Sequence, residues 1–178
     1  MIINRIASLM GLVLCMFVAL GNAQSVQSDL DKSFDFSKLK TFEFSMQTRG
    51  SSDPLVHDQL NNGRIRNALE SKLIAGGYRS DSSKPDFAVA YYVTTKNALS
   101  VQNYGYAAPR WFGGRDIRVD QYTEGTLTVD LIDLATNQLV WRGRASGAIE
   151  LKNIDNKINK SVEKLVERFL KDVRKKTS

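Results

Sequence analysis

The stretch that most constrains the fold runs from Tyr122 to Ile149, where two successive runs of residues alternate between apolar and polar. In the first run Leu127, Val129 and Leu131 fall on one face of an extended strand, because strand side chains alternate with a period of two. Between the runs, Asn137 occupies a position where a short hairpin loop often needs a positive φ. The stretch therefore predicts a long β-hairpin with one face in the core.

The other residues of the hairpin predict which of its faces are exposed to water and which are buried. Thr126, Thr128 and Asp130 lie on the opposite face of the first strand, which we expect to be wetter, with Asp130 facing solvent. Asp133 is expected to cap the turn through its side chain. In the return strand one side is shared by Leu139, Trp141, Gly143, Ala145, Gly147 and Ile149. Small residues on a core face leave room for a helix to pack closely across the sheet.

Shorter elements precede the hairpin. Alternating apolar residues predict one strand around Phe42–Phe44 and another over Phe87–Val93, with Leu99–Gln102 as a continuation or a new strand. Asp53 followed by Pro54 is typical of a helix start, and Gly76-Gly77 is typical of a helix end. We therefore expect a helix between these two points, whose apolar stripe is Ile65, Ala68, Leu69 and Leu73.

A second helix is predicted at the C-terminal end of the chain. Asn153 is a suitable N-cap, and apolar residues then recur at helical spacing, from Ile154 and Ile158 to Phe169. Together these patterns predict an α+β fold. We expect an antiparallel sheet of about four or five strands with two helices packed on one face, in the order β-α-β-β-β-α.

The N-terminal segment resembles a secretion signal. Arg5 precedes an apolar run from Ile6 to Leu20, and small residues stand at the positions that a signal peptidase reads before a cut after Ala23. We therefore predict a signal peptide over residues 1–23 and a single domain over residues 24–178. The polar residues 24–31 are expected to form a leader into this domain. The predicted location is periplasmic, or otherwise exported and soluble after cleavage.

Two alternatives to soluble export depend on the same segment. An uncleaved anchor is disfavoured because the apolar run is shorter than the ~20 residues of a spanning helix. Lipid attachment at Cys15, the sole cysteine, would make the protein a lipoprotein. Leu14 disfavours this alternative, because lipoprotein processing prefers a small residue before the cysteine.

The charge balance bears on partners. The net charge is +6, and removal of the signal peptide, which contains Arg5, would leave +5. For an exported protein this mild excess points to an anionic envelope surface, such as lipid head groups or acidic glycans, rather than to nucleic acid. Solubility alone also explains this charge, and it is the interpretation that we prefer. We expect an envelope protein, glycan or lipid surface as partner, no nucleic acid, and membrane association only through lipid attachment.

The order of several motifs resembles a bacterial envelope family known as domain of unknown function 4136. The matching segments are Asp35–Phe42, Arg64–Tyr78, Pro85–Tyr91, Glu124–Asp133 and Leu139–Gly143. The resemblance implies a compact α+β domain that is secreted or lipid-anchored, with no established activity and no functional residues to transfer. Members of this family often carry a lipoprotein cysteine at the cleavage site, and this chain has one there only if Cys15 serves.

Candidate chemistry is sparse, so we expect no enzyme, cofactor or metal site. His57 is the sole histidine, and the chain after Ala23 contains no cysteine, which leaves few ligands for a transition metal. The alternative is a hydrolase of an envelope polymer that acts through Glu124 or Asp130, because glycoside hydrolysis uses a pair of carboxylates. Such an enzyme needs a cleft in which those carboxylates converge.

A segment rich in aromatic residues, glycine and arginine is the candidate contact surface. Its stacking rings and cations could hold a sugar, a lipid head group or a partner protein, although the rings could instead cover the core. The candidate residues are Tyr104, Tyr106, Arg110, Trp111, Phe112 and Arg115. The sequence thus predicts an exported envelope protein that acts as a non-catalytic binding or structural module.

Overall fold

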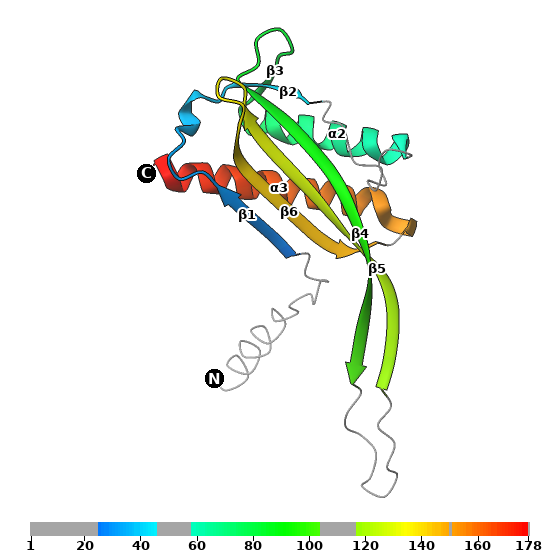
Figure 1. The fold of residues 1–178 in the computed structure, drawn as a ribbon. Coiled ribbons are helices and arrows are strands. Elements are labelled where there is room, and N and C mark those ends of the chain that lie inside the picture. The colour runs from blue at the N-terminus through cyan, green and yellow to red at the C-terminus, as the bar shows by residue number, and fades with distance from the viewer. Residues whose placement is uncertain (1–24, 46–57, 104–116, 150, 178) are drawn as a thin grey trace, which may run out of the picture.

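The computed structural model describes residues 25–45, 58–103, 117–149 and 151–177, which form one sheet with two helices on one face (Figure 1). The strands are β1 (Ser25–Leu30), β2 (Thr41–Phe44), β3 (Arg79–Ser80), β4 (Phe87–Asn103), β5 (Ile117–Asp133) and β6 (Gln138–Ala148). The helices are α2 (Gln59–Ala75) and α3 (Ile154–Thr177), with short 3-10 turns η2 (Phe36–Lys38) and η4 (Leu151–Asn153).

The six-stranded sheet has the order β1-β6-β5-β4-β2-β3 and is mostly antiparallel. The exception is β2, which is parallel to both β3 and β4. Parallel neighbours need a crossover connection, and α2 provides it between β2 and β4. The predicted α+β fold with two helices on one face is confirmed. The strand count was too low because β1 and the two-residue β3 carry no clear alternation of apolar residues.

The predicted hairpin forms β5 and β6. Leu127, Val129 and Leu131 are buried in the core, and Asn137 has the predicted positive φ, at 54°. One detail of the return strand is wrong, since Val140 is buried while Leu139 is 45% exposed. The register between the strands shifts next to Leu131, so β6 contains an extra residue and the alternation changes there.

The face of β5 that points away from the helices is more buried than its polar composition predicts. Thr128 and Asp130 are only 2% and 4% exposed, so the expectation that Asp130 faces solvent is wrong. Both residues lie in the middle of the sheet, where β4 and β6 flank β5 on its two sides. Asp130 is also covered by Arg142 of β6, which binds its carboxylate.

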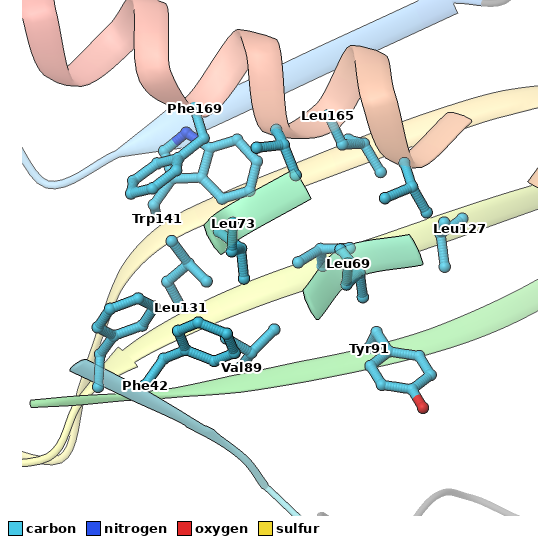
Figure 2. Packing of buried hydrophobic residues seen from close by; sticks show 14 of the residues in the cluster. Phe42, Leu69, Leu73, Val89, Tyr91, Leu127, Leu131, Trp141, Leu165 and Phe169 are labelled. Atoms are coloured by element: carbon cyan, nitrogen blue, oxygen red, sulfur yellow. The ribbon is translucent and has the colours of Figure 1, made fainter. Parts of the chain in front are cut away.

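The helices pack on the sheet through large aromatic and aliphatic side chains (Figure 2). Trp141 of β6 contacts Phe169 of α3, with ring centroids 5.3 Å apart. Next to this pair, a Cβ atom on Gly143 would lie 2.2 Å from the Trp141 ring and 2.8 Å from Leu165. Glycine is therefore required at this position, because both the Trp141 ring and Leu165 of α3 lie close to the backbone of β6.

Another expectation is wrong, because residues 25–30 form the strand β1 rather than a polar leader. This edge strand pairs antiparallel with β6, and its side chains alternate between exposed and half-buried. The Ser28 hydroxyl donates to Asp172 of α3 (2.7 Å), which also accepts from the Trp141 indole N–H (3.2 Å). These bonds attach β1 to the helix layer although the strand contains few apolar residues.

Helix α2 begins at Gln59 and ends where predicted. Its N-cap is Asp58, whose carboxylate accepts from the backbone N–H of Asn61, whereas the expected start at Asp53 and Pro54 lies outside the described residues. At the other end Gly77 has a φ of 97°, the left-handed conformation expected after this helix. Tyr78 then packs against Phe87 and Phe169.

Strands β4 and β5 extend beyond the rest of the sheet (Figure 1). They pair continuously until Asn103 faces Ile117, whereas β6 accompanies β5 only as far as Glu124. We call residues 97–103 and 117–123, which pair only with each other, the arm, and the rest of the described structure the body. The arm shows that Leu99–Gln102 continues β4, and that β5 begins at Ile117 rather than near Tyr122.

Candidate functional site

The six residues of the predicted contact surface all lie in the segment 104–116, outside the described residues. In the sequence this segment directly follows β4 and directly precedes β5. Its two flanking residues, Asn103 and Ile117, are paired across the arm. The arm is therefore the part of the described structure from which the chain enters and leaves the predicted surface.

The base of the arm is held by charged and backbone contacts. The Lys96 ammonium lies 3.1 Å from the Glu124 carboxylate, and this pair connects β4 to β5 where β6 ends. The backbone N–H of Ile149 donates to the carbonyl oxygen of Thr123 (2.8 Å). Beyond this point the described side chains are mostly exposed, and Leu99 has 64% of its surface accessible.

The strongest ion pair on the helix-free face joins Asp130 and Arg142. Two guanidinium nitrogens of Arg142 donate to the two carboxylate oxygens of Asp130, both at 2.6 Å. The pairing raises the pKa of Arg142, chiefly through the hydrogen bond to Asp130, so the guanidinium is charged at every ordinary pH. The geometry satisfies both groups, which makes Asp130 a structural anion.

The two carboxylates of the hydrolase alternative do not converge. Glu124 and Asp130 lie on the same face of β5, six residues apart, which corresponds to about 20 Å along a strand. Carboxylates that act as a pair in glycoside hydrolysis lie within about 10 Å. Glu124 binds Lys96, and Asp130 binds Arg142. Asp133 caps the turn as predicted, by accepting from the backbone N–H and hydroxyl of Thr136.

Metal chemistry has no support in the described ranges, where no cluster of histidine, cysteine and carboxylate side chains could hold an ion. His57 lies outside the described residues. The expectation that the protein uses no metal or cofactor therefore stays a prediction.

A polar groove of about 500 Å³ lies between α2 and α3, and sequence reasoning missed it. Ion pairs cross it, because Arg64 contacts Asp155 (3.1 Å) and Lys72 contacts Glu163 (2.5 Å). The bond from Lys72 lowers the pKa of Glu163. No local motif marks these partners, because they come from two helices about 90 residues apart. The uncharged walls of the groove are formed by Asn67, Ala68, Ser71 and Asn159.

The fold and these features define an α+β domain with a two-layer body, a projecting β-hairpin arm and several ion pairs between its elements. The family model described as Domain of unknown function (DUF4136) matches residues 26–169. The chain belongs to this family. The matched range includes β1, the arm and most of α3, so it covers nearly all of the described structure.

Several solved structures resemble this chain at low sequence identity. A PDZ domain protein from Parabacteroides distasonis is 13% identical with a TM-score of 0.55; the match covers 81% of this chain and 35% of that one. The chain thus spans about a third of that protein's length. The PelC dodecamer from Paraburkholderia phytofirmans is 12% identical with a TM-score of 0.42, and the match covers 81% of this chain and 95% of that one.

More distant still is a minor lipoprotein from Acinetobacter baumannii, 12% identical with a TM-score of 0.34 over 76% of this chain and 91% of that one. At such identities these likenesses concern the fold alone. No curated protein matches the sequence. Among the described residues, no helix is both long and apolar enough to cross a membrane.

Proposed function

We propose that the protein is an exported envelope protein that uses the segment 104–116, at the end of the arm, as a non-catalytic contact surface. The observation that carries this proposal is the uninterrupted pairing of β4 with β5 as far as Asn103 and Ile117. A long two-stranded ribbon costs backbone entropy and buries little apolar surface, so it contributes little to folding. Such a ribbon has a function if it positions a contact surface away from the body.

The proposed location is supported by the N-terminal sequence. Arg5, the apolar run from Ile6 to Leu20, and the small residues up to Ala23 have the order of a signal peptide. The absence of cysteine after Ala23 suits an oxidising compartment. The proposed partner is an envelope component that rings and guanidinium groups can bind, namely a glycan, a lipid head group or a protein.

The non-catalytic assignment is supported by the state of the described carboxylates. Glu124 and Asp130 are far apart along β5, and each neutralises a neighbouring cation. Neither carboxylate is positioned to share a substrate with the other, as the hydrolase alternative requires. Binding accounts for the arm without any reacting group.

The test compares binding of three proteins to washed envelope fractions of the producing cells. The wild type is measured beside Trp111→Ala/Arg115→Ala and a matched control, Leu60→Ala/Arg79→Ala, which removes an exposed apolar residue and an exposed arginine from the body. We expect Trp111→Ala/Arg115→Ala to bind about tenfold or more weakly, because aromatic and arginine anchors dominate many interfaces. The control should bind as the wild type does. Equal binding by all three proteins would show that the surface is assigned wrongly.

A further inference from the structure

Cationic residues recur along α3 at helical spacing. Six of them follow one another at intervals of three or four residues: Lys157, Lys160, Lys164, Arg168, Lys171 and Lys175. At 3.6 residues per turn these positions fall within about 80° of arc, and they extend over about 27 Å of helix. We call this set the basic stripe. It runs along most of the helix that spans the sheet in Figure 1.

The basic stripe lies on the outer surface of α3, away from the core residues Val162, Leu165 and Phe169. It is displaced toward the edge strand β1, because the Arg168 side chain donates to the Ser28 hydroxyl (2.8 Å). Lys160, Lys164, Lys171 and Lys175 are all exposed. The stripe therefore follows a convex ridge of the molecule.

The carboxylates of α3 are mostly engaged elsewhere. Asp155 and Glu163 face α2, where they bind Arg64 and Lys72. Asp172 is buried and accepts from Ser28, Trp141 and Arg168. Glu167 lies exposed beside the stripe and forms no ion pair with any described residue.

Within the described residues, Lys160, Lys164, Lys171 and Lys175 form no ion pair. Four exposed ammonium groups thus stand in a row, and Glu167 is the carboxylate of α3 beside them that forms no ion pair in the part of the chain that the structure describes. This arrangement leaves a net positive ridge whose charge the fold does not neutralise.

We propose that the basic stripe is an electrostatic docking surface for an anionic phospholipid membrane, with α3 lying parallel to the head groups. The shape of the site selects this occupant. A straight convex ridge presents all of its cations to a plane at once, whereas a linear polyanion is better held in a groove. The stripe contains no apolar side chain that would insert, so the attachment is reversible and falls with salt. It requires no lipid attachment at Cys15, and so differs from the sequence-based expectation that only lipid attachment would bring the protein to a membrane.

The test measures binding to phosphatidylglycerol vesicles, with phosphatidylcholine vesicles as the reference. The readout is the difference between the two lipids, because the apolar segment Ile6–Leu20, if retained, would partition into both. The test variant is Lys160→Gln/Lys164→Gln/Lys171→Gln. Its matched control is Lys38→Gln/Lys40→Gln/Lys84→Gln, which removes the same charge from exposed lysines that do not belong to α3.

Each lysine close to an anionic surface contributes about fivefold to binding, so we expect the stripe variant to bind phosphatidylglycerol about 100-fold more weakly. The control should lose less than about tenfold, because its lysines do not face the membrane. An equal loss in both variants would overturn the proposal, since net charge alone would then explain binding. Binding to soluble inorganic polyphosphate without binding to vesicles would also overturn it. The outcome is independent of Trp111 and Arg115, so the proposed function can fail while this inference stands.

Discussion

The body and the arm are built from the same two strands, but they use them differently. Where β4 and β5 cross the body, Val89, Val129 and Leu131 are almost fully buried against α2 and α3. Where the strands continue into the arm, they pair only with each other, and Leu99 is largely exposed. One continuous ribbon thus passes from a tightly packed core into a region without a second layer.

Strand pairing and apolar burial therefore extend over different lengths of the same two strands. Backbone hydrogen bonds continue along the whole ribbon, whereas apolar burial ends near Leu127. Since burial supplies most of the favourable free energy of folding, the body should determine global stability and the arm should open locally. Four predictions test this division, in order of expected effect.

The largest effect is expected in the body for Trp141→Ala. The indole packs against Phe169 and over Gly143, and its N–H donates to Asp172. Removing it leaves a cavity and takes one of three donors from Asp172, so the free energy of unfolding should fall by about 3–5 kcal/mol. Urea unfolding measures this, with the exposed Leu60→Ala as control. A loss below about 1 kcal/mol would contradict the central place given to this contact.

The second prediction concerns the ion pair on the helix-free face of the body. Arg142→Met leaves the Asp130 carboxylate buried without its cation, and should cost about 2–3 kcal/mol. This figure lies below that of a fully buried pair because Arg142 is 32% exposed. The double variant Asp130→Asn/Arg142→Met should recover much of the loss. If the double variant is less stable than Arg142→Met, the unpaired charge is not the cause.

The third prediction concerns the end of the body farthest from the arm, where Asp86 accepts from the backbone N–H groups of Thr41 and Lys40. These bonds lower the pKa of Asp86 below its ordinary value of 3.8. Their stabilisation is therefore complete above pH about 4 and is lost as the pH falls through the lowered pKa. Asp86→Asn should cost about 1 kcal/mol at neutral pH.

The check on Asp86 is the pH dependence of the difference between variant and wild type. The difference in free energy of unfolding should shrink as the pH falls below about 4, because the wild-type carboxylate is then protonated too. Other titrating groups contribute equally to both proteins and cancel. A difference that stays constant down to pH about 2 would show that the charge of Asp86 is not what holds β2 to β4.

The smallest effect is expected in the arm. Leu99→Ala should change the free energy of unfolding by less than about 0.5 kcal/mol, because this side chain is 64% exposed. Amide hydrogen exchange should also be faster in residues 97–99 than in residues 87–93 of the same strand. A cost above about 1 kcal/mol would mean that Leu99 is packed in solution, and the division between arm and body would fail.

The elements that the sequence predicted are those in which apolar residues recur at the spacing of a strand or a helix. Leu127, Val129 and Leu131 in β5, and Val162, Leu165 and Phe169 in α3, are buried as their spacing indicates. Asn137 and Gly77 adopt the conformations that their types permit. In each case the determining interaction is local, so a short window of sequence contains the information.

The errors come from interactions with distant segments. The strand β1 has little apolar character, and it is held by pairing with β6 and by the bond from Ser28 to Asp172. Asp130 is buried because Arg142 binds it from the next strand. The groove between α2 and α3 depends in the same way on residues that only the fold brings together. The predicted contact surface at 104–116 lies outside the described residues and stays a prediction.

The position of β1 also constrains the order in which the fold can be completed. The bond from Ser28 to Asp172 joins residues that are 144 positions apart in the chain. Because a chain is synthesised from its N-terminus, β1 emerges first, yet its partner strand β6 and helix α3 emerge last. Contacts of such long range close slowly, since the entropy of the intervening chain must be lost first. The edge of this sheet therefore stays open until almost the whole protein has been made.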